Sequence, residues 1–288
     1  MPLQPRQINS LKLALTHVSL ILLSVVFLIP FFWLISTSLK PIADTVSQPP
    51  VWIPKPPQWH NYKDAFLYDS DRLGYIPFLY YTRNTILLCW LTVVGTVFSN
   101  ALAAYGFARL RWRGREAFFL VTLATMMVPF PVLMVPLYGL VKAMGWIGTL
   151  RPLWVPAFFG SAFNIFLLRQ FFRGIPFELS EAATIDGANE WQIFSTVVVP
   201  LAKPALAVVA LFTFLGTWTD FLGPLIYLVE QKTFTLSLGL QFYQSQNGGT
   251  QWNLLMAATT IVILPVIVLF FFTQKVLIRG IALTGLKA

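Results

Sequence analysis

Carboxylates and small residues alternate in one polar stretch of this chain, residues 181–188, which reads Glu-Ala-Ala-Thr-Ile-Asp-Gly-Ala. The stretch lies between two long apolar runs, and neither a membrane span nor a water-soluble core explains it. Glu181 and Asp186 offer polar contacts at the rim of a groove, while Ala182 and Ala183 are small enough to allow a close approach of the backbone. The pattern therefore predicts a docking element for another protein.

Residue types that carry catalysis or hold a metal ion are otherwise sparse. His17 and His60 are isolated, and no group of His, Asp and Glu has the spacing of a metal site. The single cysteine, Cys89, allows no disulfide within the chain. No nucleophile stands beside a base, and the phosphate-binding pattern G-x-x-x-x-G-K-[ST] is absent from the 288 residues. The sequence therefore predicts a chain that is not an enzyme, holds no cofactor and receives any energy from ATP through a partner.

The composition is that of an integral membrane protein. Hydrophobic residues make up 57% of the chain and charged residues 11%, whereas an ordinary soluble domain has about 25% charged residues. The mean hydropathy is +0.70. Because lipid satisfies no backbone polar group and a bilayer core is about 30 Å thick, a spanning helix needs about 20 apolar residues.

Six apolar runs reach this length, so the sequence predicts an all-α membrane protein with six transmembrane helices in one domain, residues 1–288. The first run is too long for a signal peptide and lacks a cleavage site after a short apolar core, so we count it as a span. The predicted spans lie near residues 13–39, 85–108, 117–141, 153–172, 205–228 and 254–277.

The connector at residues 109–116 predicts the orientation of the chain. It holds four arginines in eight residues, and Lys and Arg favour the cytoplasmic side of a membrane. This connector and both termini are therefore predicted to be cytoplasmic. The formal charge of +9 then reflects Lys and Arg that meet anionic headgroups. Nucleic-acid binding is a poorer account of that charge, because no basic run is interleaved with stacking aromatic residues.

The docking element lies within the longest cytoplasmic connector, residues 174–204, whose pattern predicts two short helices. Acidic residues near its start favour the positive end of a helix dipole. Gly187 suits the left-handed conformation that ends a helix, and Asn189 with Gln192 resembles a capping box that opens the second helix. An amphipathic helix on the membrane surface is the alternative, although such helices usually place large apolar residues opposite Lys and Arg.

Two further patterns concern packing. Gly95, Ser99 and Ala103 recur every four residues in the second span, so one face permits the close approach of a neighbouring helix. Prolines in the third and fourth spans predict kinked helices around a cavity, the alternative being the general frequency of proline in membrane helices. The loop of residues 41–81 is rich in proline and aromatic residues, which predicts an ordered, irregular cap on the outer side.

The cytoplasmic connector resembles the EAA motif of permease subunits of bacterial ABC importers, in the version of carbohydrate-uptake permeases of the maltose-permease type. The residues that carry this resemblance are Glu181, Ala182, Ala183, Asp186, Gly187, Ala188, Phe194, Pro200 and Pro204. Other stretches that look like the family are Asn84, residues 104–108, 218–224, 235–240 and 257–265, and Gln274. The tail, residues 280–288, resembles the family's glycine-rich end but departs from it at Leu286.

This resemblance implies the fold of an ABC type I importer permease, with a cytoplasmic coupling helix between spans four and five. That helix would sit in a cleft of an ATPase subunit, which binds the ATP and Mg. Closure of the ATPase dimer would then open the translocation path outward. The residues that would couple to the ATPase are Glu181, Ala182, Ala183, Asp186, Gly187 and Ala188.

The implied assembly lies in the bacterial cytoplasmic (inner) membrane. Its other members would be a second permease subunit in a heterodimer, the ATPase dimer and a periplasmic or lipid-anchored solute-binding protein. The chain would form half of the path for a sugar or sugar-like solute, such as an oligosaccharide, disaccharide or glycoside. A non-sugar solute such as glycerol phosphate is an alternative. An ion-coupled secondary transporter fits less well, because the chain shows neither an internal repeat nor a coupling-ion carboxylate beyond Asp220.

Three residues are candidates for the substrate path. Asp220 is the one carboxylate predicted within a span, where a charge costs on the order of 3 kcal/mol. Trp218, two residues before it, would stack on a sugar face, and Asn253 is the third candidate. The alternatives are a hydrated or subunit-bonded Asp220 near the outer third of its helix, and a helix-packing hydrogen bond for Asn253.

Overall fold

The computed structural model describes residues 5–244 and 249–285, and every regular element within these ranges is helical. The described chain forms two compact units. The first comprises the residues up to Tyr68 together with Leu240–Leu264, and the second comprises Asp69–Gly239 together with the residues from Pro265 onward. The predicted single domain remains a prediction, and the departure of the tail at Leu286 lies outside the described residues.

The first unit holds one long apolar helix and an irregular loop. Asn61 fixes this loop, because its Nδ2 donates to the carbonyl oxygens of Ser38 and Lys40, at 2.9 Å each. The Lys40 ammonium is buried 3.6 Å from the centroid of the Trp33 ring, and this burial lowers the pKa of Lys40. The cap predicted from the prolines is thus ordered over this part. The elements are α1 (Pro5–Ser38), η1 (Ile42–Thr45), α2 (His60–Phe66), η6 (Leu240–Tyr243) and the first part of α15 (Trp252–Gly285).

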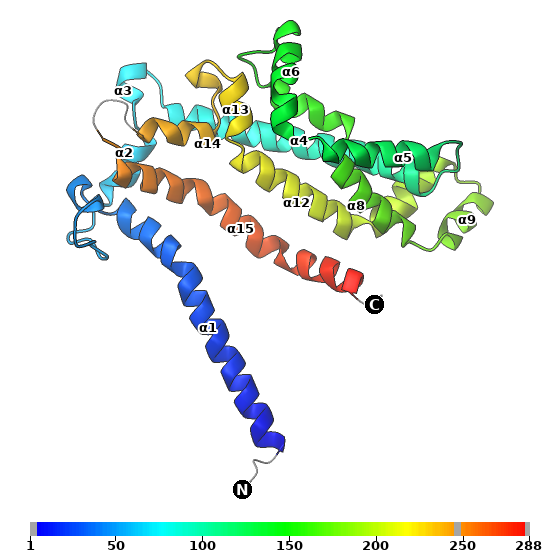
Figure 1. The fold of residues 1–288 in the computed structure, drawn as a ribbon, viewed down its shortest axis with the longest axis horizontal. Coiled ribbons are helices and arrows are strands. Elements are labelled where there is room, and N and C mark those ends of the chain that lie inside the picture. The colour runs from blue at the N-terminus through cyan, green and yellow to red at the C-terminus, as the bar shows by residue number, and fades with distance from the viewer. Residues whose placement is uncertain (1–4, 245–248, 286–288) are drawn as a thin grey trace. The chain divides into compact units, whose positions relative to one another are not determined.

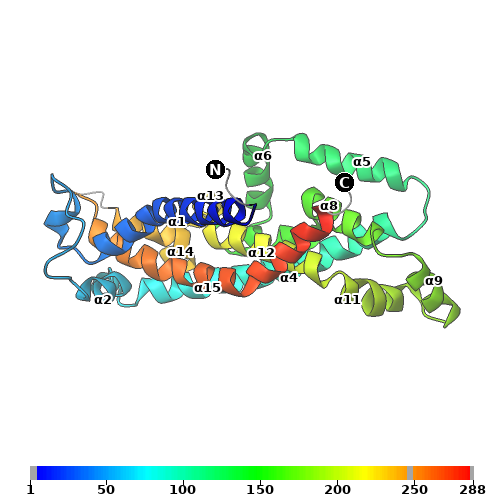
Figure 2. The same cartoon turned by 90° about the horizontal axis from the view of Figure 1, so that it is seen from below.

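The second unit is a helical bundle in which α4, α8 and α12 lie side by side, as Figures 1 and 2 show. Short helices lead into and out of these three. The elements are α3 (Ser70–Leu73), α4 (Pro77–Ala108), α5 (Arg115–Ala124), η2 (Thr125–Met127), α6 (Phe130–Ala143), α7 (Arg151–Trp154), η3 (Val155–Phe159), α8 (Ala162–Arg173), α9 (Glu178–Ile185), α10 (Glu190–Gln192), the π-helical η4 (Ile193–Val198), α11 (Val199–Leu201), α12 (Lys203–Thr219), α13 (Leu222–Tyr227), η5 (Gln231–Thr233), α14 (Leu236–Gly239) and the remainder of α15.

The small residues of α4 allow the close packing that their spacing predicted. A Cβ added at Gly95 would lie 2.5 Å from the Phe158 ring, so only glycine leaves room for this contact. One turn further on, the Ser99 hydroxyl donates to the Ala157 carbonyl oxygen at 2.9 Å. The α4 face that carries these residues therefore packs directly against η3.

The candidate spans agree with a six-span protein, with two of the six bent. Among the described residues, four helices are long and apolar enough to cross a membrane, within Lys12–Ser38, Pro77–Ala108, Arg151–Arg173 and Trp252–Gln274. Two further pairs qualify if each pair is one span. Arg115–Met127 meets Phe130–Ala143 at 98°, and Glu190–Leu201 meets Lys203–Thr219 at 78°.

Several predicted span boundaries need correction, and each correction has a local cause. The second span begins at Pro77 instead of residue 85, because proline is well suited to the first helical position. The third does not run straight through residues 117–141. Val128 is extended, as the residue before a proline tends to be, and the helix restarts at Phe130 after Pro129.

The fourth and fifth spans are also interrupted. Within residues 153–172 the helix breaks at Gly160, whose φ of +81° belongs to the left-handed region. The fifth helix ends at Thr219 instead of running to residue 228, because Asp220 is extended and α13 begins separately at Leu222. The positions of the prolines in the sequence therefore did not predict where these two spans break.

Candidate functional site

The docking segment, residues 178–192, contains the docking element of residues 181–188 and folds as a helix, a tight turn and a second helix, as its sequence predicts. Helix α9 ends at Ile185, and Gly187 follows with a φ of +84°. The Ala188 amide donates back to the Ala183 carbonyl oxygen at 2.9 Å, which closes the turn. Asn189 then opens the second helix with a capping box, in which its side chain and that of Gln192 each accept from the other's backbone amide.

The two adjacent alanines of the segment, Ala182 and Ala183, differ in exposure. Ala182 is exposed, whereas Ala183 is half-buried and packs with Ala188 against the buried core of the second unit. Of the two, Ala182 has the more exposed surface to meet a groove on a partner, with the exposed Glu181 beside it. Ala183 instead lets α9 lie close to its own bundle, a role that the sequence pattern did not separate from docking.

Large apolar side chains stand out around the exposed part of the segment. Ile185 is 86% exposed, and Phe177, Leu179 and Trp191 are each more than 40% exposed. Apolar groups gathered next to acidic ones are typical of a surface that meets a protein. Sequence reasoning missed Ile185, although its position four residues after Glu181 places it on the same side of the helix.

The C-terminal end of α4 holds the docking segment on both flanks. After α9, the Tyr105 hydroxyl donates to the Glu190 Oε2 atom at 2.5 Å, and the Tyr105 ring meets Phe194 edge-on with centroids 5.1 Å apart. Before α9, the Arg109 Nη2 atom donates to the Ile175 carbonyl oxygen at 2.9 Å. Tyr105 and Arg109 are both buried, and their spacing of four residues places them on one face of α4.

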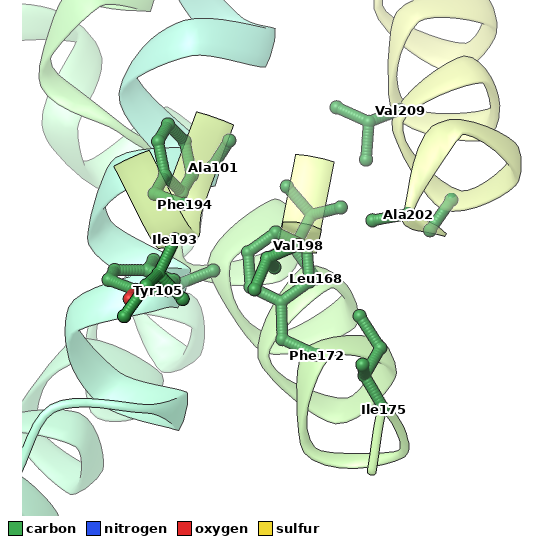
Figure 3. Close-up of a cluster of buried hydrophobic side chains, with 12 residues drawn as sticks. Ala101, Tyr105, Leu168, Phe172, Ile175, Ile193, Phe194, Val198, Ala202 and Val209 are labelled. Carbon is green, nitrogen blue, oxygen red and sulfur yellow. The ribbon is translucent and has the colours of Figure 1, made fainter. Parts of the chain in front are cut away.

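A buried cluster continues this attachment into the bundle, and Figure 3 shows its side chains gathered from α4, α8, η4 and α12. Leu168 and Phe172 of α8, Val198 of η4 and Val209 of α12 have no exposed surface. Their contacts join the helices on either side of the docking segment into one packed body. The residues of the cluster are Ala101, Ala104, Tyr105, Leu168, Phe172, Ile175, Ile193, Phe194, Val198, Ala202, Ala205 and Val209.

Asp220 lies at the break between α12 and α13. Its Oδ1 atom accepts a hydrogen bond of 3.1 Å from the Gly223 amide, and the residue is half-buried. A carboxylate in this place satisfies a free amide at the start of α13 and suits the positive end of that helix. This bond is within the chain, and a contact of Asp220 with a solute, with water or with another subunit stays a prediction.

Trp218 and Asn253 are both largely buried, at 5% and 8% exposure. The Trp218 ring stacks on Phe214, with centroids 5.3 Å apart and planes at 25°. In the first unit, the Asn253 Nδ2 atom donates to the Asn61 Oδ1 atom at 3.2 Å, which is the packing contact that was the alternative for this residue. The Asn253 Oδ1 atom is buried with no partner among the described residues. The assignment of these residues to a substrate path therefore remains a prediction.

The described part of the chain contains no group of three or more His, Cys, Asp and Glu residues that could hold a metal ion. Its distinctive feature is instead the docking segment, which presents acidic and apolar side chains outward and is fixed to the bundle from within. Such an arrangement is suited to a rigid attachment between this chain and another protein.

Comparison with known proteins gives consistent matches over nearly the whole chain. The model of the family described as binding-protein-dependent transport system inner membrane component matches residues 73–283. The arabinooligosaccharides transport system permease protein AraQ of Bacillus subtilis is 34% identical over 286 residues, covering 98% of either chain. The trehalose/maltose transport system permease protein MalG of Thermococcus litoralis is 28% identical, with 96% of this chain and 98% of that one covered.

One solved structure is similar over its full length. It belongs to a bacterial ABC transporter involved in the import of the acidic polysaccharide alginate. A chain of it matches with a TM-score of 0.80 and 25% identity, covering 96% of this chain and 99% of that one. The predicted fold of an importer permease is thereby confirmed.

Proposed function

Because this chain belongs to the family of binding-protein-dependent transport system inner membrane components, we propose that it is a transmembrane subunit of an ATP-driven sugar importer. It forms half of the translocation path and couples that path to a cytoplasmic ATPase. The observation that carries the coupling role is the docking segment, in which α9 exposes Glu181 and Ile185 while Tyr105 and Arg109 fix both of its flanks to α4.

The mechanism that follows is a rigid-body movement. An ATPase subunit holds α9 by its exposed acidic and apolar side chains, and closure of an ATPase dimer shifts α9. Because the flanks of α9 are bonded to α4 and packed into the buried cluster, the shift passes to α4, α8 and α12 as a unit. ATP and Mg are bound on the ATPase, and this chain contributes no catalytic residue.

The solute we propose is a sugar, such as an oligosaccharide or a disaccharide. The relatives named for arabinooligosaccharides and for trehalose and maltose support this class, as does the alginate importer. Of the candidate path residues, Asp220 lies at a helix break and is half-buried. Polar groups at broken helices are a common basis for solute sites within membranes.

The remaining partners complete the importer. A second permease subunit supplies the other half of the path, and a periplasmic or lipid-anchored binding protein delivers the sugar from outside. The membrane is the bacterial cytoplasmic membrane, with both termini and the docking segment on the cytoplasmic side. The four arginines of residues 109–116 support this orientation.

Reconstitution tests this function. The tagged chain is purified in mild detergent, its co-purified subunits are identified by mass spectrometry, and the assembly is placed in liposomes with ATP inside and its binding protein outside. We expect an ATPase and a second permease to co-purify, and labelled oligosaccharide to enter only with ATP. Uptake that needs an ion gradient and no ATP would contradict the proposal. Uptake of glycerol phosphate but no sugar would contradict the solute class alone.

A further inference from the structure

The connector between α4 and α5 carries positive charges that its contacts within the chain do not neutralise. It follows α4 directly, so it lies where a membrane span meets the headgroups. Arg109 is buried against the Ile175 carbonyl, and Arg115 bonds to the Leu110 carbonyl oxygen at 2.9 Å and to Glu116. Arg111 and Arg113 are exposed and form no ion pair with any described residue.

A hollow of about 410 Å³ opens beside these arginines. Its one acidic residue, Glu116, is already neutralised, because both of its carboxylate oxygens accept from the Nη2 atom of the buried Arg169, at 2.9 and 2.7 Å. The hollow is therefore positive, and guanidinium groups are the side chains best suited to hold a phosphate group. Its lining residues are Arg111, Trp112, Gly114, Arg115, Glu116 and Ala117.

Two aromatic side chains, Trp112 of the connector and Phe118 of α5, add an apolar side to this site. Trp112 is 41% exposed and Phe118 is 62% exposed, with their ring centroids 5.8 Å apart. The Trp112 ring is held in place because its Nε1 atom donates to the Gly106 carbonyl oxygen at 3.1 Å. Tryptophan at the level of the headgroups contacts both the polar and the acyl regions of a lipid. A free phosphate ion has no apolar part that could contact these rings.

We propose that this connector is a binding site for the headgroup of an anionic phospholipid of the adjoining leaflet. Arg111 and Arg115, which line the hollow, hold the phosphate, and the exposed Arg113 between them in the sequence adds positive charge. The part of an acyl chain nearest the headgroup lies against Trp112 and Phe118. The site also adjoins the docking segment, because the Arg111 guanidinium lies 5.9 Å from the centroid of the Phe177 ring, directly before α9. A bound lipid therefore steadies the connector next to the coupling helix.

The proposal needs only that α4 crosses the membrane, so it stands apart from the identity of the solute and of the ATPase. Two other occupants would use the same positive charge. Inorganic phosphate shares the chemistry of the headgroup, and an acidic patch on a partner subunit would also suit the arginines. The exposed aromatic pair favours the lipid over both.

Native mass spectrometry of the full chain, with the subunits that co-purify, tests this site. Phosphatidylglycerol or phosphatidylcholine is titrated into the detergent-purified protein, and the bound lipids are counted. We expect the double variant Arg111→Gln/Arg113→Gln to bind phosphatidylglycerol at least about tenfold more weakly, since each basic residue near a membrane surface contributes about 1 kcal/mol. Phosphatidylcholine binding should not change.

A matched control removes the same charge elsewhere. Lys142 and Arg151 are exposed and lie in other helices, so Lys142→Gln/Arg151→Gln should bind phosphatidylglycerol as the unchanged protein does. A second variant, Arg111→Lys/Arg113→Lys, guards against a folding defect. It should keep part of the binding, because lysine retains the charge but not the two-pronged hydrogen bonding of arginine.

Three results would overturn the proposal. The first is equal phosphatidylglycerol binding by the Gln double variant and the control. The second is displacement of the lipid by inorganic phosphate at millimolar concentration, which would mean a site for a soluble anion. The third is loss of a co-purifying subunit from the Gln double variant while its lipid binding is unchanged, which would assign the arginines to a protein partner.

Discussion

Glu181 lies on the exposed side of α9, and the structure gives its side chain no hydrogen bond or ion pair with other described residues. We expect Glu181→Lys to leave insertion and folding intact and to lower ATP-driven uptake at least about tenfold, because a wrong charge at a protein interface costs several kcal/mol. The loss of uptake is measured in proteoliposomes, and attachment of the ATPase is measured by its recovery with the tagged chain. Glu230→Lys, an equally exposed reversal before η5, is the control. Normal uptake by the Glu181→Lys variant would show that Glu181 is not part of the coupling site.

Two substitutions at Asp220 distinguish a role in the sugar path from a role in capping α13. Asparagine keeps an oxygen for the Gly223 amide but loses the charge, whereas alanine loses both. If the charge serves the path, Asp220→Asn changes sugar uptake severalfold without loosening the ATPase. Asp220→Ala additionally lowers the free energy of unfolding by about 1 kcal/mol, the usual cost of a lost cap. Unchanged uptake by the Asn variant, measured beside thermal stability, would leave Asp220 with the capping role alone.

At the scale of elements, the attachment of α9 to α4 is the feature on which transmission depends. Tyr105→Phe removes only the hydroxyl that bonds Glu190. Because the acceptor is a carboxylate, the net interaction is about 2 kcal/mol. We expect this variant to assemble normally but to spend severalfold more ATP per sugar imported, because α9 then moves partly without α4. The measurement is the ratio of ATP hydrolysed to sugar taken up.

A double-variant cycle tests that pair directly. Glu190→Ala, which removes the acceptor oxygen, should raise the ATP cost in the same way. Tyr105→Phe/Glu190→Ala should be no worse than either single change, since the two substitutions break one contact. Fully additive effects would show that Tyr105 and Glu190 act separately and that their hydrogen bond is not the link.

Gly187 offers a second test at this scale. A Cβ at Gly187 would meet nothing within 4 Å, so its requirement for glycine comes only from the φ of +84°. Gly187→Ala should cost about 1 kcal/mol in the turn and reduce coupled uptake severalfold. Gly106→Ala is the matched control, because that position is equally open but helical. An equal effect of both changes on uptake would refute the conformational argument.

The helix, turn and helix of the docking segment were predictable because their signals are local, namely Gly187 and the Asn189–Gln192 capping box. The attachment to α4 was less visible, since Glu190 bonds to a tyrosine 85 positions earlier in the chain. The spacing of Tyr105 and Arg109 places them on one face of α4 but names no partner. The prediction of the span ends failed for a related reason. The breaks at Gly160 and Asp220 lie inside apolar stretches, where hydropathy gives no sign of a turn.

At the scale of the whole molecule, composition and span length were enough to establish a membrane protein of up to six spans. The resemblance of a short connector then led to the family that the full-length matches confirm. Hydropathy reports only that a residue avoids water, so it does not distinguish a side chain that lines a path from one that packs. Trp218, stacked on Phe214 and 5% exposed, illustrates this limit.

The orientation of the whole chain in the membrane gives the last prediction. If the arginine-rich connector is cytoplasmic, single cysteines placed by Arg113→Cys and by Gln231→Cys should lie on opposite sides, because α4 begins next to η5 and ends at the connector. Asn84 of α4 supports this arrangement, since its Nδ2 atom donates to the Lys232 carbonyl oxygen at 2.8 Å. Both substitutions are made in a Cys89→Ser background. A membrane-impermeant maleimide should label the Gln231 site in intact cells and the Arg113 site only after the cells are opened. The reverse pattern would invert the topology and place the docking segment out of reach of any cytoplasmic ATPase.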